Sequence, residues 1–76
     1  MIITVTNNQP FQATNTEFSF TITDSGTYTL YMSANGIDFT PYEETITGPD
    51  TVVVSGVVPD MFFKIDGIDG QLTVLI

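Results

Sequence analysis

The chain of 76 residues contains no cysteine, histidine, tryptophan or arginine, and its single lysine is Lys64. The lack of cysteine excludes a disulfide framework and a thiol nucleophile. The lack of histidine excludes serine–histidine catalysis and the usual zinc sites, and the lack of arginine excludes a bidentate clamp on phosphate or carboxylate. We therefore expect a protein that is not an enzyme, with no catalytic residues and no cofactor.

Positive charge is scarce: nine acidic residues face one lysine, and the formal net charge is -8. Such a chain repels nucleic acid and anionic lipid, so we expect neither as a partner. No apolar run approaches the ~20 residues of a membrane helix. Residues 1–6 lack the basic start and long apolar stretch of a signal peptide. We expect a soluble protein made in the cytoplasm.

The chain is short but has the composition of a folded domain. Apolar residues make up 42% and charged residues 13%, the reverse of a disordered chain. The length allows one domain, residues 1–76. A domain of this size is marginally stable, and small proteins usually add disulfides, metals or oligomerisation. Because cysteine is absent, self-association or docking on a larger partner is the natural source of added stability.

The sequence pattern favours strands almost throughout. Thirteen threonines alternate mostly with apolar residues, as on a pleated, half-buried surface. Alternation predicts strands at residues 1–6, 17–23, 27–33, 37–42, 51–58, 61–66 and 71–76, with 43–47 as an extension of the fourth strand or a separate edge strand. In the second, Phe18, Phe20 and Ile22 should face inward. Residues 51–58 are apolar on both faces in part, which predicts a central or covered strand.

Turn signals separate these strands every eight to twelve residues. Asn35-Gly36 is the strongest hairpin signal, because both residues tolerate positive φ. Residues 11–16 fit a loop or irregular edge. This spacing predicts an all-β fold, a compact antiparallel β-sandwich of the immunoglobulin-like kind with six to seven short strands.

Two groups of acidic residues have the residue types of a chemical site. Residues 66–70 place Asp66 and Asp69 beside glycines, where a hard cation could bind, but the spacing and the missing glutamate do not match a calcium loop. Asp-Gly pairs are ordinary turn formers, so we expect no metal site there. Glu43 and Glu44 with Asp38 resemble a carboxylate pair, but adjacent carboxylates usually form a solvated edge, and a domain of this size has little room for a cleft.

Apolar side chains outside the expected core indicate contact with a partner. Four aromatic residues fall in loops or on polar faces, and aromatic rings are enriched at interfaces. The chain also finishes on an apolar strand, which needs cover if its edge is unpaired; alternatively, the first and last strands pair with each other or lie centrally. The predicted partner-binding residues are Phe11, Tyr31, Tyr42, Phe62, Leu75 and Ile76.

Residues 25–40 and 57–65, within a stretch that covers about half of the chain, resemble small β-sandwich structural proteins of tailed bacteriophages, including accessory capsid proteins of crAss-like phages. The shared outline is a strand, then Ser-x-Asn/Asp-Gly-x-x-aromatic, a valine-rich strand, a turn and an aromatic strand near a basic residue. The matching positions are Ser33, Asn35, Gly36, Phe39, Phe63 and Lys64. The family's basic residue is often arginine, and here it is lysine.

The resemblance implies a virion protein that carries no catalytic residues. We expect an auxiliary (decoration) protein that binds the outer surface of a tailed-phage capsid and stabilises the shell after synthesis in the host bacterial cytoplasm. Its partners would be the major capsid protein or other virion proteins, with a homo-oligomer as a further option. The alternative is a head- or tail-fibre domain that binds a host glycan or protein.

Overall fold

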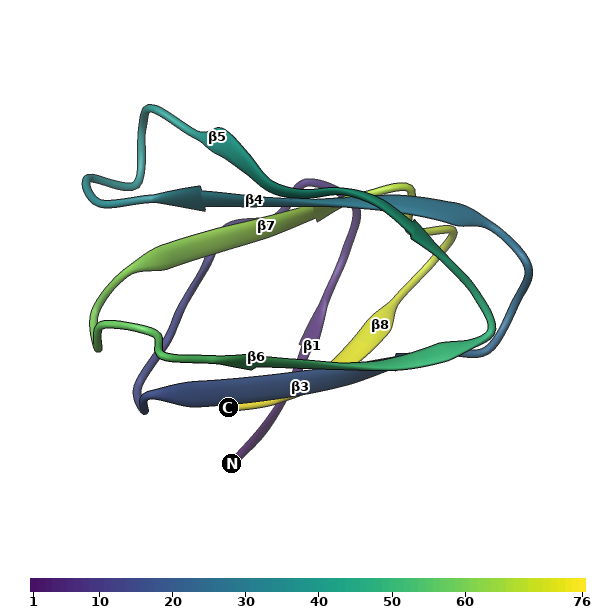
Figure 1. Ribbon diagram of the computed structural model, residues 1–76, viewed down its shortest axis with the longest axis horizontal. Helices are drawn as coiled ribbons and strands as arrows, with labels where there is room; N and C mark the ends of the chain where they lie inside the picture. Colours follow the sequence, from purple (N-terminus) through teal and green to yellow (C-terminus); the bar gives the residue numbers. More distant parts are fainter.

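Eight strands form two four-stranded antiparallel sheets, seen as two layers in the computed structural model, which describes residues 1–76 (Figure 1). The strands are β1 (Ile2–Val5), β2 (Phe11–Gln12), β3 (Glu17–Ile22), β4 (Thr27–Ser33), β5 (Thr40–Thr47), β6 (Asp50–Ser55), β7 (Phe62–Asp66) and β8 (Leu72–Leu75). Sheet A has the order β1-β8-β3-β6 and sheet B the order β2-β7-β4-β5. The prediction of an all-β antiparallel sandwich is confirmed. The structure contains no helix that is long and apolar enough to cross a membrane.

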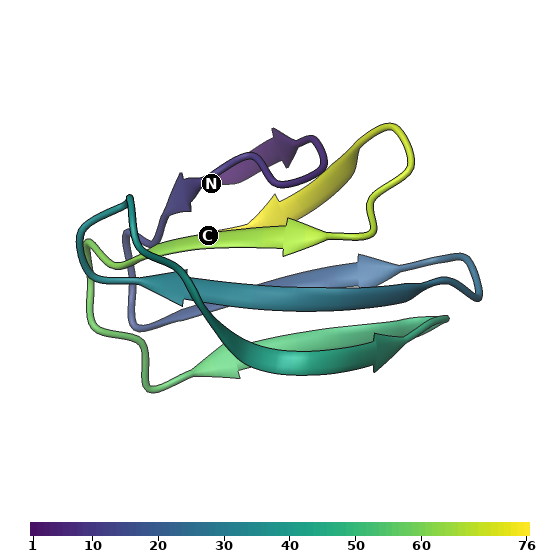
Figure 2. The same ribbon diagram turned by 90° about the horizontal axis from the view of Figure 1, so that it is seen from above.

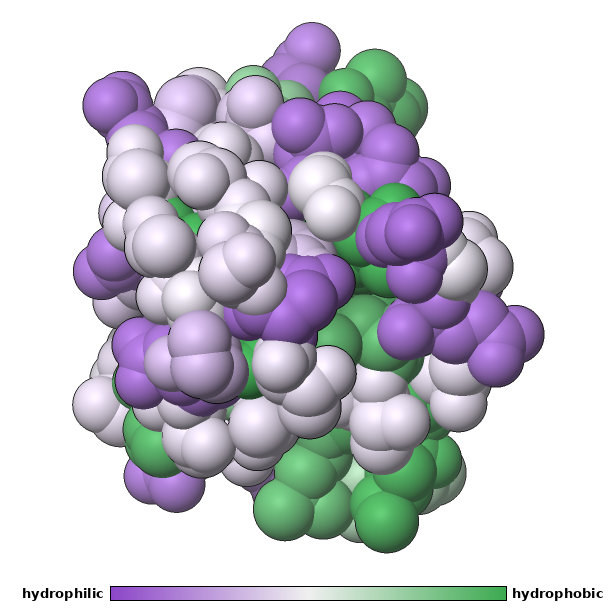
Figure 3. Space-filling model, turned by 90° about the vertical axis from the view of Figure 1, so that its right-hand side faces the viewer, coloured by the Kyte–Doolittle hydropathy of each residue, from purple (hydrophilic) through white to green (hydrophobic).

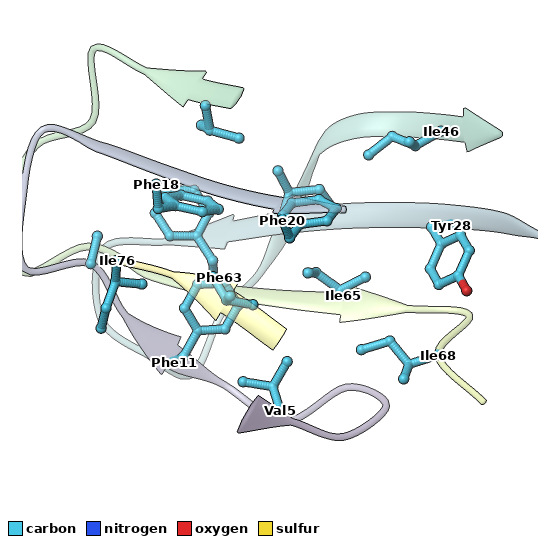
Figure 4. Close-up of a cluster of buried hydrophobic side chains, with 14 of the residues drawn as sticks. Val5, Phe11, Phe18, Phe20, Tyr28, Ile46, Phe63, Ile65, Ile68 and Ile76 are labelled. Carbon is cyan, nitrogen blue, oxygen red and sulfur yellow. The ribbon is translucent and has the colours of Figure 1, made fainter. Parts of the chain in front are cut away.

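A core of sixteen buried apolar residues joins the two sheets. Alternation along β3 turns Phe18, Phe20 and Ile22 inward, as predicted. The ring of Phe18 lies 4.7 Å from that of Phe63 on β7 and 5.5 Å from that of Phe11 on β2, measured between centroids. Figure 4 shows these three rings gathered between the strands. Such aromatic contacts add to the stabilisation that comes from burying the rings.

The first and last strands pair with each other. Ile3 of β1 lies opposite Val74 of β8, and the Ile76 N–H donates to the Met1 carbonyl oxygen at 2.9 Å. On its other side β8 pairs with β3, so both of its edges are covered within the chain. Figures 1 and 2 both show the two termini close together. The alternative in which the terminal strands pair is therefore confirmed, and Ile76 is buried in the core.

Three sequence predictions were wrong. Residues 51–58 do not form a central or covered strand: β6 is an edge strand of sheet A, and Val53 is 58% exposed. The fourth strand does not begin at residue 37, because the loop lasts to residue 39; the alternative in which residues 43–47 extend this strand is confirmed, since β5 continues from Thr40 through the proline to Thr47. Phe11 is neither in a loop nor exposed; it pairs with Phe63, and its ring fills the core.

The turn between β3 and β4 fixes one tyrosine at the rim of the core. The Tyr28 side chain is buried, and its hydroxyl donates to the carboxylate of Asp24, 2.9 and 3.0 Å from the two oxygens. The same carboxylate accepts the Gly26 N–H at 2.9 Å. Burial, the hydrogen bond to Asp24 and the negative charges of Asp24 and Asp69 all raise the pKa of Tyr28 above its ordinary value of 10.0.

A raised tyrosine pKa makes stability fall at alkaline pH. Below pH 10 the hydroxyl is protonated in both states, and its full contribution to stability is present. As pH rises beyond 10, the unfolded state loses the proton first and is thereby stabilised relative to the folded state. We expect Tyr28→Phe to lower the free energy of unfolding by about 1 kcal/mol at neutral pH. The difference from the wild type should shrink as pH passes 10. Urea unfolding followed by circular dichroism at several pH values measures it, and a constant difference would contradict the argument.

Candidate interaction surfaces

The acidic residues form no cluster of three or more possible metal ligands. In the connection from β7 to β8, the Asn7 Oδ1 accepts the N–H groups of Gly67 and Ile68 at 2.7 and 3.1 Å. Asn8 Nδ2 donates to Asp66 Oδ1 at 2.8 Å. Hydrogen bonds within the chain thus hold this segment as a turn.

The outer side of sheet B carries a cluster of three aromatic rings and the only lysine. Tyr31 on β4 and Lys64 on β7 are register partners. The Lys64 Nζ lies 5.3 Å from the ring centroid of Tyr31 and 4.7 Å from that of Phe39. A cation over an aromatic ring is attracted by the ring's negative face. The chain's single ammonium group is therefore held between two rings, and all three side chains are half-buried.

The loop from residue 34 to residue 39 is shaped by one asparagine. Asn35 Oδ1 accepts the N–H groups of Ile37 and Asp38 at 2.8 and 2.9 Å, and Asn35 Nδ2 donates to Asp38 Oδ2 at 2.9 Å. Such side-chain contacts to nearby backbone are the usual way in which asparagine fixes a turn. This rigid turn brings Phe39 back over sheet B, beside Lys64.

Gly36 of the same loop covers the third ring. Its φ is +77°, and a side-chain carbon at this position would lie 3.3 Å from the ring of Phe62 on β7. Glycine therefore serves both the backbone conformation and the close approach. We call Tyr31, Phe39, Phe62 and Lys64 the aromatic face.

The outer side of sheet A has the opposite character: it carries no charge across its centre. Cross-strand pairing sets its side chains in two rows. One row is apolar except for a serine, and the other consists of threonines, of which Thr21 and Thr51 are hydrogen-bonded through their hydroxyls at 3.1 Å. Only Glu17, at the start of β3, adds a carboxylate at the margin. We call this surface the neutral face; its residues are Ile2, Leu75, Ser19 and Val53 in the first row and Thr4, Thr73, Thr21 and Thr51 in the second.

Apolar side chains on the neutral face are strongly exposed. The exposed fractions are 68% for Ile2, 53% for Leu75 and 58% for Val53. Figure 3 shows apolar side chains gathered at the lower end of the molecule, the side on which sheet A lies in Figure 1. A groove of about 490 Å³ opens between β3 and β8, and no charged residue lines it. It arises because the two strands pair only at Ser19–Leu75 and Phe20–Val74.

The structure separates the predicted partner-binding residues. Tyr31 and Phe62 come together on the aromatic face, and Leu75 lies on the neutral face on the far side of the molecule. Tyr42 is 44% exposed at β5 and touches the core ring of Phe63 edge-on, with 6.5 Å between centroids. Two of the six, Phe11 and Ile76, are buried and offer no contact surface.

Sequence reasoning missed two residues of these faces. Phe39 falls in the predicted strand 37–42, and only its place in the Ser-x-Asn-Gly-x-x-aromatic pattern marked it. Val53 alternates with Val52 and Val54, and its outward direction could have been read from that alternation. The prediction of a central or covered strand at residues 51–58 placed Val53 away from solvent instead.

No protein-family model matches the chain, and the comparisons with curated proteins and with solved structures find no match.

Proposed function

We propose that this protein is an auxiliary (decoration) protein that binds the outer surface of a tailed-phage capsid and stabilises the shell. The observation that carries the proposal is the aromatic face. Tyr31, Phe39 and Phe62 lie on or over the outer side of sheet B, and aromatic rings are among the side chains that most often dominate binding between proteins. Their order comes from the Lys64 and Gly36 contacts, so little conformational freedom is lost on docking.

Charge supports a capsid partner. The net charge is -8, and many of the carboxylates lie on β5 and in the turns around the sheets. A strongly acidic small protein is steered toward a basic surface and repelled from nucleic acid. Many identical copies held by a capsid lattice also gain stability by mass action, because binding favours the folded state.

A fibre domain that binds a host glycan is the second candidate, and the same aromatic face favours it. Sugar rings stack on exposed aromatic faces. Here, however, Lys64 covers one side of Tyr31 and Phe39, and Gly36 covers Phe62. Less ring surface is left for stacking, which favours a protein partner over a glycan.

The test uses capsids assembled without this protein, from a tailed phage that encodes it. We expect the purified chain to bind them and to raise the temperature at which they rupture. The double variant Tyr31→Ala/Phe39→Ala should bind at least about tenfold more weakly. Tyr42→Ala removes an exposed tyrosine from another part of the surface and should bind like the wild type.

Two outcomes would contradict the proposal. One is that the wild type neither binds the capsids nor changes their rupture temperature. The other is that the chain binds a defined glycan on an array and loses that binding in the double variant, which would assign the aromatic face to host recognition.

A further inference from the structure

We propose that two copies of this chain associate face to face through their neutral faces, as a symmetric dimer. The inference does not depend on the capsid proposal, because it concerns the opposite side of the molecule. Three observations carry it: the charge distribution, the shape of the face and its size.

Charge selects a second copy as the occupant. Two chains of net charge -8 repel each other, and burying unpaired carboxylates between them would be costly. On the neutral face they meet with the fewest carboxylates between them, because its only charges lie at the margin, on Glu17 and on the terminal ammonium group of Met1. A basic partner would instead gain most by docking on the acidic parts of the surface. The uncharged surface of an acidic protein is therefore the one suited to a copy of itself.

Shape makes the face self-complementary. Val53 projects from β6 on one side of β3, and the groove lies on the other side of β3, toward β8. A two-fold axis that lies in the plane between the two faces, parallel to β3, places the β6 side of one copy opposite the β8 side of the other. Val53 of each copy then enters the groove of the other, where Ile2, Leu72 and Leu75 supply apolar contacts. This reciprocal contact is the defining property of an isologous interface.

Size is compatible with a small specific interface. The molecule measures 30 × 24 × 20 Å, and Figure 1 looks down the shortest dimension with the sheets stacked vertically. The outer side of sheet A therefore lies within 30 by 20 Å. Two footprints of that size set an upper limit of roughly 1,200 Å² of buried surface, which is the lower end of the range for specific interfaces. Sheets that pack face to face interdigitate their side chains across about 10 Å, as these rows would.

The dimer also accounts for the exposed apolar row. A single domain of this size buries only ~60% of its unfolded surface and gains from association. Covering Ile2, Leu75 and Val53 removes from water three side chains that are more than half exposed. Each contributes through the hydrophobic effect in proportion to the area buried.

The first test is the molar mass in solution. Sedimentation equilibrium of the wild-type chain over a range of concentrations should give a molar mass of twice 8.3 kDa at the highest concentrations. Val53→Glu places a carboxylate in the groove of the partner and should raise the dissociation constant at least about tenfold. Val58→Glu is the matched control: Val58 is 64% exposed but follows β6 and lies outside the neutral face, so this variant should dimerise like the wild type.

Salt and cross-linking give independent readings. Because the interface is uncharged and the rest of the chain is acidic, sodium chloride should strengthen the dimer by screening repulsion. The chain has no cysteine, so a single Ser19→Cys at the centre of the face should give a disulfide-linked dimer on oxidation, and Val58→Cys should not. A wild type that stays monomeric, or a dimer that Val53→Glu leaves intact, overturns the proposal. Circular dichroism of each variant separates loss of the dimer from loss of the fold.

Discussion

Replacing Phe63 by alanine is expected to destabilise the domain more than any other single truncation. Phe63 is 1% exposed, and its ring lies 4.7 Å from that of Phe18 and 6.1 Å from that of Phe11. Truncating a buried phenylalanine costs about 3–5 kcal/mol, because transfer energy is lost and a cavity remains. A domain of this length has roughly 4–11 kcal/mol in total. Urea unfolding followed by circular dichroism measures the loss, and the melting temperature should fall by roughly 15 °C or more.

The neighbouring residue provides the control. Phe62 has the same side chain and the same strand but points to the aromatic face, where it is half-buried. We expect Phe62→Ala to cost less than half as much as Phe63→Ala. Equal losses from the two variants would mean that Phe63 is not the centre of the core.

Local alternation was sufficient to predict which side chains face inward. Along β3 the pattern of Phe18, Phe20 and Ile22 separated by serine and threonine has only one orientation that buries the large side chains. The strand predicted at 27–33 has the bounds of β4, because turn signals flank it on both sides. These features depend on residues close in the sequence, and a period of two specifies them.

Strand order could not be predicted in the same way, because it depends on pairing between distant segments. The carboxyl-terminal strand β8 inserts between β1 and β3, and this leaves β6 at the edge. No pattern in residues 51–58 indicates that this strand lies at the edge of its sheet. The strand also ends at Ser55, three residues before the predicted end, because Gly56 takes a φ of +71°. The burial of Phe11 was not predicted, because a strand of two residues is too short to show a period of two.

The neutral face and the aromatic face also depend partly on local alternation and partly on pairing between distant strands. Each exposed side chain of the neutral face follows from alternation, but the alignment of Ile2, Leu75, Ser19 and Val53 in one row exists only through the register of four strands. The aromatic face likewise joins β4, β7 and the loop between β4 and β5. A chain almost without reactive side chains thus derives its specific surfaces from register, and changes that disturb the register should affect both faces at once.

The connection from β7 to β8, which links sheet B to sheet A, contains the second site of large expected effect, Gly67. Gly67 has a φ of +106°, and a side-chain carbon there would lie 2.5 Å from the Thr27 carbonyl oxygen and 3.3 Å from the Tyr28 Cα.

Gly67→Ala must therefore shift backbone as well as adopt a strained conformation, and we expect a loss of about 3 kcal/mol or more in the free energy of unfolding. Gly70→Ala is the matched control in the same connection: its φ is +82°, but nothing lies within 4 Å of the added carbon. Strain alone should cost about 1–2 kcal/mol there. Urea unfolding of the two variants side by side measures the difference, which isolates the clash with β4. Similar losses from both would show that Thr27 moves aside freely and that this connection does not fix the position of β8.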